Sequence, residues 1–284
     1  MNPVGHAVRV GLRRGWTEFV LSLRSGQDQS FYLVVGVAVL GYLWINRTGT
    51  VDGTDLSYPA IALPGILGSF LVLGTVIGPG FALATEKEDG TLLRARATPH
   101  GLVGYVAGQV VYHALSILPL LLMVLVPSLL LLDVPVPATA GAWLRFVALV
   151  ALAVVATLPL GLALGALSPD SRRVGTWGML PFVGVTAISG IYFPMAALWS
   201  WVQVLAQVFP VYWVGIGMRS VFLPDAAATL EITGTWRTTE TFAVLGAWAV
   251  AGLCLAPILL RRTVRRQSGA AVAAARHQAA HYVR

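Results

Sequence analysis

Long apolar stretches, separated by short polar ones, dominate the chain. An apolar helix of about 20 residues is long enough to cross the ~30 Å hydrocarbon core of a bilayer. We therefore expect six membrane-spanning helices, at about residues 30–46, 58–84, 102–132, 143–167, 177–197 and 241–260. The pattern predicts an all-α polytopic membrane protein. It has one transmembrane domain over residues 1–266 and a loose cytoplasmic tail over 267–284.

Apolar residues recur every three or four positions over residues 4–25, before the first predicted span. They are Val8, Leu12, Trp16, Phe19, Val20 and Leu23, and Arg9 and Arg13 fall on the opposite face. This period is typical of an amphipathic helix. Arg14 and Glu18 have the spacing of an ion pair along it. We expect an interfacial helix that lies in the headgroup layer; a disordered basic leader is the alternative.

The segment 198–224 is rich in tryptophan and other apolar residues, but Pro210 interrupts it. Proline breaks a straight helix, and backbone that bends at membrane depth must be shielded by protein. We therefore expect an extracellular re-entrant helix pair between the fifth and sixth spans. The same tryptophans also fit an aromatic belt at the outer interface, and both readings are compatible.

Charged residues make up 11% of the chain and apolar residues 57%, whereas a soluble domain has about 25% charged residues. Fifteen of the nineteen Lys and Arg residues fall on one side of the predicted spans. Cytoplasmic connections carry such an excess, so we expect both termini and the connection 85–101 in the cytoplasm. The basic residues flank the spans, which argues against a nucleic-acid partner. Eighteen arginines against one lysine are typical of a GC-rich bacterial genome, so we expect the bacterial cytoplasmic (inner) membrane.

The connection 85–101, between the second and third predicted spans, is strongly charged. Its charged residues are Glu86, Lys87, Glu88, Asp89, Arg94 and Arg96. Thr85 and Glu88 have the spacing of a capping box. Any cytoplasmic connection between spans is charged, so the charges alone do not identify a site.

The same connection has the residues that begin and end a short helix. Thr91, which follows Gly90, is suited to an N-cap, and Leu92–Ala97 is long enough for roughly two turns. Thr98 and Pro99 end the helix, because the residue before a proline avoids helical angles. We therefore expect a short capped helix in the cytoplasm that is offered to a partner protein.

Tyr105, Gln109 and His113 form a polar stripe along the third predicted span, because they recur every four residues. Polar groups at membrane depth face the interior of the bundle or a wet cavity. Either these side chains line the path of a substrate, or they hydrogen-bond neighbouring helices, which is the commoner role.

Several functions are excluded by residues that the chain lacks. A P-loop needs Gly-Lys-Ser or Gly-Lys-Thr, and the only lysine, Lys87, lies between two glutamates, so the chain does not hydrolyse ATP. The five histidines have no metal-ligand spacing, and we expect no metal site. No Asp or Glu falls in the middle of a predicted span and no internal repeat is visible, which argues against an ion-coupled secondary transporter.

Two motifs resemble those of the permease subunits of the ABC-2 exporter family, particularly the daunorubicin-resistance-type drug exporters. The family has a cytoplasmic signature E-R-E-x-G-T-L-E-R-L-R-A-T-P between its second and third spans. The residues that fit it are Glu86, Lys87, Glu88, Gly90, Thr91, Leu92, Arg94, Arg96, Ala97, Thr98 and Pro99. Leu93, Ala95 and the His100-Gly101 pair depart from it.

The second motif lies near the end of the fifth predicted span. Residues 189–194, Ser-Gly-Ile-Tyr-Phe-Pro, resemble the S-G-x-F-F-P stretch of the family. The residues that follow and look like those of its re-entrant helices are Trp201, Ala206, Pro210, Tyr212 and Arg219. With the interfacial helix, the spans and the basic end, the resemblance covers the whole length of the chain.

The resemblance implies an ATP-driven exporter. Two copies of a separate ABC ATP-binding subunit would bind ATP and Mg, and a second permease subunit, as a homodimer, would complete the complex; this chain itself would bind no cofactor. The residues expected to contact the ATPase are Glu86, Lys87, Glu88, Gly90, Thr91, Arg94, Arg96, Thr98 and Pro99. The residues expected to form an extracellular gate are Ser189, Gly190, Phe193 and Pro194.

The expected cargo also follows from the family. It is a hydrophobic or amphiphilic molecule, such as a drug-like metabolite or a lipid, and the alternative within the family is a lipid-linked glycan or a peptide. The residues favour an ion-coupled secondary transporter less than either of these exporters.

Overall fold

The computed structural model describes residues 2–50, 56–192, 195 and 198–266 of the chain. Six long helices hold most of these residues: α1 (Pro3–Ser22), α2 (Gly26–Ile45), α3 (Tyr58–Glu88), α5 (Gly101–Leu131), α6 (Ala140–Leu167) and α11 (Thr238–Arg266). Shorter helices connect them: α4 (Thr91–Ala97), α7 (Ser171–Gly175), α8 (Met179–Ile188), α9 (Ser200–Val208), α10 (Pro210–Phe222) and the 3-10 helix η2 (Asp225–Leu230). The predicted tail 267–284 lies outside the described residues.

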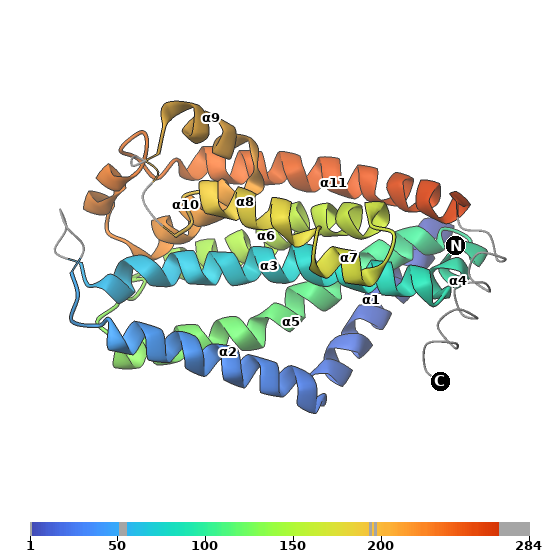
Figure 1. Ribbon diagram of the computed structural model, residues 1–284, viewed down its shortest axis with the longest axis horizontal. Helices are drawn as coiled ribbons and strands as arrows, with labels where there is room; N and C mark the ends of the chain where they lie inside the picture. Colours follow the sequence, from blue (N-terminus) through green and yellow to red (C-terminus); the bar gives the residue numbers. More distant parts are fainter. Residues whose placement is uncertain (1, 51–55, 193–194, 196–197, 267–284) are drawn as a thin grey trace.

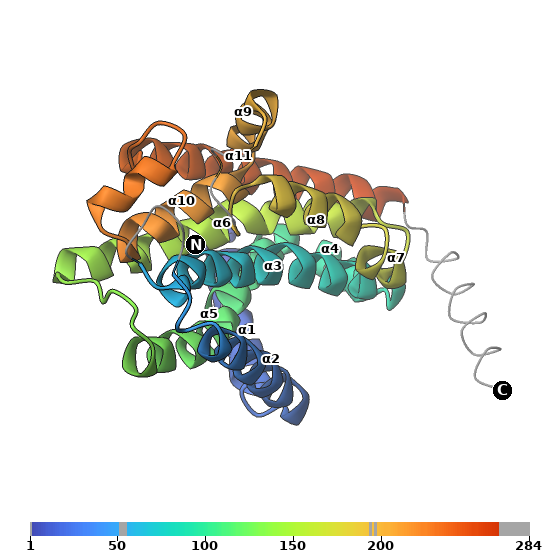
Figure 2. The ribbon, with the colours of Figure 1, turned by 60° about the vertical axis from the view of Figure 1, so that its left-hand side comes forward.

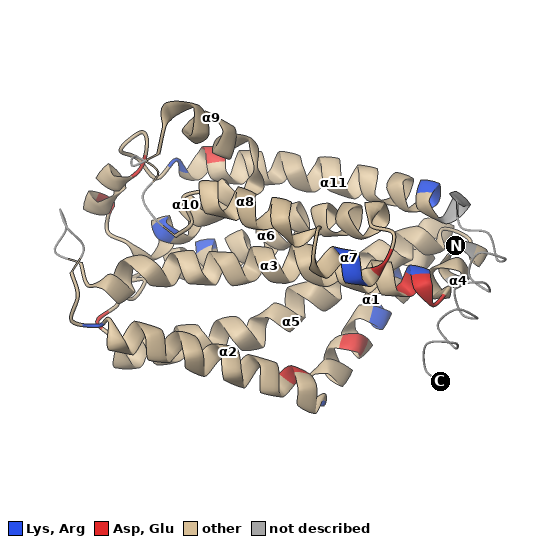
Figure 3. Ribbon diagram, in the orientation of Figure 1, with Lys and Arg blue, Asp and Glu red and all other residues tan. Residues whose placement is uncertain are grey.

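The long helices have the properties of membrane spans. Five of them in the described part of the chain, α2, α3, α5, α6 and α11, are long and apolar enough to cross a bilayer. Charged residues gather towards the two ends of the bundle and leave its middle apolar (Figure 3). The prediction of an all-helical polytopic membrane protein is confirmed.

Helix α8 is shorter than the predicted span 177–197 that contains it. Its ten residues extend for about 15 Å, half the thickness of a hydrocarbon core. The helix ends at Ile188 because Gly190, two residues later, has a left-handed backbone with φ of 67°. A left-handed glycine directly after a helix is a common stop. The continuous fifth span is therefore corrected to a short helix followed by a turn.

In the described part of the chain, α9 and α10 taken together are also long and apolar enough to cross a bilayer. The two helices meet at an angle of 94°. Phe209 at the bend is extended, and Pro210 is the first residue of α10, where a missing N–H costs nothing. Almost every residue of α10 is buried. The helix pair expected over 198–224 is present, and its depth in the membrane stays a prediction.

Helix α3 lies in the middle of the bundle and packs against α5, α6 and α10 (Figures 1 and 2). Two helix pairs come into backbone contact through glycines. A Cβ placed on Gly165 of α6 would lie 2.4 Å from the carbonyl oxygen of Gly80 in α3. A Cβ placed on Gly11 of α1 would lie 2.0 Å from the carbonyl oxygen of Gly104 in α5. Small residues permit such close approach.

The bundle has two different ends. One, which we call the α4 end, carries α4, α7 and the last turn of α11 (Figure 1). The opposite one, the α9 end, carries α9, α10 and η2 (Figure 1). By the distribution of Lys and Arg along the chain, we expect the α4 end in the cytoplasm.

Candidate functional site

The last turn of α3 holds three consecutive charged residues, and each contacts a different helix at the α4 end. Glu86 pairs with α1, because its Oε1 accepts a hydrogen bond from Arg14 Nη2 at 3.0 Å. Arg14 also donates from Nε to Glu18 at 2.6 Å and lies over the ring of Tyr105, 5.6 Å from its centre. Burial lowers the pKa of Arg14, but the two carboxylates outweigh this and raise that pKa above its ordinary value. Arg14 therefore stays charged and joins α1 to α3 and α5.

Lys87 points into the protein. Its Nζ donates to the carbonyl oxygens of Gly165 at 3.0 Å, Ala166 at 3.2 Å and Ser168 at 2.6 Å. These are among the last carbonyls of α6, which have no partner within their own helix, and a cation at a helix C-terminus is stabilising. Only 7% of Lys87 is exposed. The chain's single lysine therefore holds the end of α6 rather than presenting its charge at the surface.

Glu88 contacts α7. Its Oε1 accepts a hydrogen bond from the backbone N–H of Ser171 at 2.6 Å, and its Oε2 accepts one from the hydroxyl of the same residue at 3.1 Å. Asp170 caps the same short helix by accepting from the N–H of Arg173 at 2.7 Å. The N-terminus of α7 is thus fixed by a carboxylate from α3 as well as by its own cap.

Helix α4 follows after a sharp turn at Gly90, whose φ is 74°. Gly90 occupies the N-cap position, so the expected N-cap at Thr91 is wrong. The Thr91 hydroxyl instead donates to the carbonyl oxygen of Glu86 at 3.2 Å. The expected capping box is also wrong, because Thr85 lies inside α3 and its hydroxyl donates to Phe81. The capping-box error arises because α3 continues past the end of its apolar run, and the N-cap error arises because left-handed Gly90 takes that position.

The far end of α4 agrees with the sequence. The helix ends at Ala97, and Thr98 before Pro99 has an extended backbone. Thr98 and Pro99 are exposed. The backbone of Arg94 and Arg96 lies within α4.

One apolar side chain fixes α4 to the bundle. Leu92 is buried, with 1% of its surface exposed, and it packs in a cluster with Leu83 of α3, Leu102 of α5 and Leu260 of α11. The opposite face of α4 is open at Thr91 and Ala97. The helix is thus held firmly on one side and accessible on the other.

An open cavity of about 590 Å³ is lined by residues of α1, α4 and the start of α5. The residues that line it include Ala7, Gly11, Arg14, Ala95, Pro99 and Tyr105. It lies between the helix predicted to bind a partner and the helix predicted to lie at the membrane interface.

The structure separates the members of the polar stripe on α5. Tyr105 lies at the α4 end, under Arg14. Gln109 and His113 are buried and hydrogen-bond each other, with 3.0 Å between Gln109 Oε1 and His113 Nε2. The imidazole of His113 fills the space beside Gly78 of α3, where a Cβ would lie 2.9 Å from Cε1. The hydrogen bond thus runs along α5 and does not reach a neighbouring helix. Hydrogen bonding to other helices and a role in the substrate path both stay predictions.

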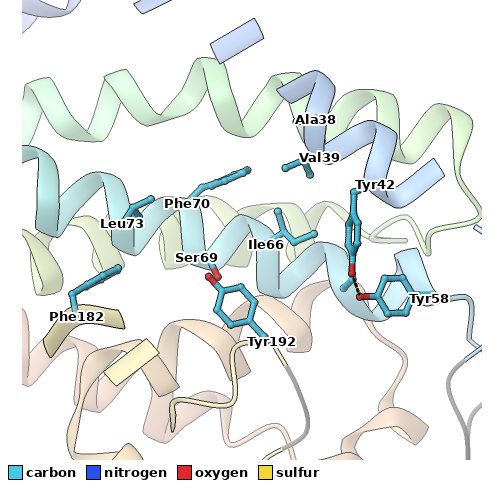
Figure 4. Close-up of a pocket in the computed structure, with 11 residues that line it drawn as sticks. Ala38, Val39, Tyr42, Tyr58, Ile66, Ser69, Phe70, Leu73, Phe182 and Tyr192 are labelled. Carbon is cyan, nitrogen blue, oxygen red and sulfur yellow. Dashed lines mark hydrogen bonds between the residues drawn. The ribbon is translucent and has the colours of Figure 1, made fainter. Parts of the chain in front are cut away.

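A second cavity, of about 460 Å³, opens between α2, α3 and α8 (Figure 4). The residues that line it include Val39, Tyr42, Tyr58, Phe70, Phe182 and Tyr192. The hydroxyls of Tyr42 and Tyr58 lie 2.5 Å apart and close one side (Figure 4). Sequence reasoning did not find this site, because aromatic residues within apolar runs give no signal that distinguishes a cavity wall from a lipid-facing surface.

Two of the expected gate residues, Ser189 and Gly190, lie a few residues before Tyr192, which lines this cavity. Ser189 is buried, Gly190 takes the left-handed turn, and Tyr192 lines the cavity. Phe193 and Pro194 lie outside the described residues. Sequence reasoning also missed two contacts between distant residues, Arg14 with Glu86 and Arg219 with Glu231, since nothing in one sequence links charges so far apart.

Apolar helices long enough to span a bilayer, joined at one end by short charged helices, define a multi-pass membrane protein. The chain belongs to the ABC-2 type transporter family, whose model matches residues 7–223. It is thus a permease of the ABC type, a transport subunit of a kind that generally lacks its own ATPase site, and the family implies association with an ABC ATP-binding subunit. We found no match to the chain among curated proteins.

Proposed function

We propose that this chain is the membrane-spanning subunit of an ATP-driven exporter in the bacterial cytoplasmic membrane. Two copies of a separate subunit hydrolyse ATP, and two copies of this chain form the pathway. The cargo is a hydrophobic or amphiphilic molecule, such as a drug-like metabolite or a lipid, and it leaves the cell. The ABC-2 family match supports the permease role.

One observation carries the proposal: the last turn of α3 fastens three other helices directly before the exposed helix α4. Glu86, Lys87 and Glu88 contact α1, α6 and α7 respectively. A force on α4 is therefore transmitted within a few residues to much of the bundle. A switch driven by a bound ligand needs a stiff element joined to helices that can take two arrangements, and α4 with the end of α3 supplies the stiff element.

The cavity between α2, α3 and α8 supports the choice of cargo. Its volume of about 460 Å³ lies in the range of small-molecule sites, roughly 300–1,000 Å³, which are mostly apolar with a few polar groups. The polar groups here include the hydroxyls of Tyr42, Tyr58 and Ser69. An amphiphile fits such a lining better than a charged solute does. A lipid-linked glycan or a peptide is the alternative cargo.

Site-directed crosslinking tests the contact with the ATPase. Cys254 is the only cysteine, so Cys254→Ala gives a background in which Thr91→Cys on the open face of α4 carries a photoreactive maleimide. We expect crosslinking in native membranes to capture a protein with a P-loop. Thr229→Cys, an exposed position at the α9 end, is the matched control. Equal capture of such a protein from both positions, or capture from neither, would reject the proposed docking site.

A transport assay tests the energy source. The captured ATPase and the permease are reconstituted together in vesicles, and efflux of ethidium and flipping of a fluorescent phosphatidylcholine are followed with and without ATP. We expect transport of at least one probe that needs both proteins and ATP. Uphill movement of either probe by the permease alone would reject an ATP-driven mechanism and favour a secondary transporter.

A further inference from the structure

The turn that follows α8, residues 189–192, is held by a charged side chain from α10. Arg219 Nη1 donates a hydrogen bond to the carbonyl oxygen of Gly190 at 2.8 Å. Arg219 Nε donates to Glu231 Oε1 at 2.5 Å, and Glu231 directly follows η2. The arginine thus joins α10, the turn after α8 and the end of η2. We call residues 189–192 the gate loop.

The gate loop is also wedged between two helices. Ile191 is 2% exposed. Its carbonyl oxygen packs against Gly65 of α3, and a Cβ placed on Gly65 would lie only 2.0 Å from this oxygen. Its side chain approaches Gly215 of α10, where a Cβ would lie 3.2 Å from Cγ1. The loop therefore has one position in this fold, set by α3, by α10 and by Arg219.

The burial of the ion pair argues against a large contribution to the stability of the fold. The side chains of Arg219 and Glu231 are only 10% and 3% exposed, so both charges are removed from water. In addition, Arg219 Nη2 and Glu231 Oε2 are buried and have no hydrogen-bond partner in the described structure. Such a pair often stabilises no better than apolar side chains of the same size, because desolvation offsets the attraction. Its position on the gate loop is then the better explanation for it.

The gate loop forms part of the wall of the 460 Å³ cavity. Tyr192 lines that cavity, and it also lines a cleft of about 20 Å³ together with Arg219, Glu231 and Trp236. Releasing Arg219 from Gly190 therefore frees a segment that borders both hollows.

We propose that Arg219 is a positioning residue for the outer gate: with Glu231 it latches residues 189–192 against α3 and closes the cavity towards the α9 end. The idea rests on the proposed function, because it takes this cavity as the substrate's route. When the bundle rearranges, the hydrogen bond from Arg219 to Gly190 breaks and the loop moves away from α3. The ion pair with Glu231 remains, so the arginine stays neutralised while the loop is open.

The test measures how accessible the gate loop is when the latch is removed. Arg219→Met alone would leave a buried Glu231 unpaired and endanger folding, so both charges are replaced, as Arg219→Met with Glu231→Leu. In a Cys254→Ala background, Ser189→Cys is a nearly isosteric probe, since Ser189 is 1% exposed. Purified permease in detergent is treated with a water-soluble maleimide. We expect the double variant to label at Ser189→Cys about tenfold faster.

A second probe separates release of the loop from general loosening. Ser128→Cys, on α5, starts from a side chain that is fully buried. A purely structural role for the pair predicts faster labelling at both probes and a lower thermal midpoint, and that result would overturn the proposal. Unchanged labelling at Ser189→Cys would overturn it too. Arg219→Lys, with Glu231 retained, keeps a donor for the carbonyl of Gly190. We expect this variant to label at Ser189→Cys as slowly as the protein with Arg219.

A neighbouring arginine provides the matched control for the substitution. Arg237 contacts Gln207 at 2.6 Å and lies over the ring of Trp213, but it does not hold the gate loop. Arg237→Met should leave labelling at Ser189→Cys slow. The measurement uses neither ATP nor an ATPase, so a failure of the latch and a failure of ATP-driven export are distinguishable.

Discussion

Arg14 of α1 and Glu86 of α3 form an ion pair with 3.0 Å between Nη2 and Oε1, although 72 residues separate them in the sequence. The pair joins the helix expected at the membrane interface to the helix at the centre of the bundle. It lies directly before α4, the helix that we propose contacts the ATPase. A relative movement of α1 and α3 must break it.

Replacing Arg14 should impair coupling more than folding. The side chains of Arg14 and Glu86 are 45% and 21% exposed, and such partly exposed pairs contribute only about 0.2–1 kcal/mol. We expect Arg14→Met to leave the thermal midpoint nearly unchanged and to lower the amount of probe transported per ATP hydrolysed. Arg13→Met, at an exposed neighbouring position, is the control. A normal ratio of transport to hydrolysis in Arg14→Met would contradict this role.

Replacing Lys87 should impair folding. Lys87→Met leaves three carbonyls at the C-terminal end and cap of α6 without their donor, and an unsatisfied buried polar group costs roughly 1–3 kcal/mol. We expect a lower thermal midpoint in detergent, with Thr91→Ala on the exposed face of α4 as a control near wild type. The wild-type amine should also resist an amine-reactive ester until the protein unfolds. Rapid modification of Lys87 in the folded protein would show that it is not enclosed.

The contact between α1 and α5 predicts opposite effects for two glycines of the same helix. At Gly11 an added methyl group collides with the backbone of Gly104, and overpacking costs typically ~1–3 kcal/mol. At Gly5 the nearest atom to a Cβ is 3.9 Å away, so alanine fits and raises helix propensity by up to ~1 kcal/mol. We expect Gly11→Ala to lower the thermal midpoint and Gly5→Ala to maintain or raise it. Equal effects would argue against the docked position of α1.

The turn at Gly90 requires glycine. Its φ of 74° is left-handed, and a β-branched side chain there costs about 1–2 kcal/mol. We expect Gly90→Val to tilt α4, to keep the bundle folded and to reduce transport while the ATPase still hydrolyses ATP. Gly175→Ala, where a Cβ meets nothing within 4 Å, is the control at the same end. Full transport by Gly90→Val would show that the direction of α4 does not matter.

The helices were predictable because their length and hydropathy are properties of local sequence. Their ends were less so. The last turn of α3 extends beyond the apolar run, since Lys87 and Glu88 find partners on α6 and α7 that a single sequence does not reveal. Helix α8 ends early because Gly190 adopts a left-handed backbone, which composition alone does not fix.

The first helix shows the same limit. Its periodicity predicted a helix, but the buried face is the stripe of Ala7, Gly11 and Gly15, and not the large apolar side chains. Trp16, for example, is 56% exposed. Only small residues allow α1 to approach α5 so closely. The large side chains remain free to enter a lipid surface, so the interfacial location stays a prediction.

The glycine contact between α1 and α5 limits how the protein can respond to a push. With the carbonyl of Gly104 seated against Gly11, α1 has no room to slide along its neighbour. Helix α4 leads into the start of α5 through Thr98 and Pro99. A movement of α1 and a movement of α4 therefore both act on the first turns of α5. The rest of the bundle then responds to the two movements together.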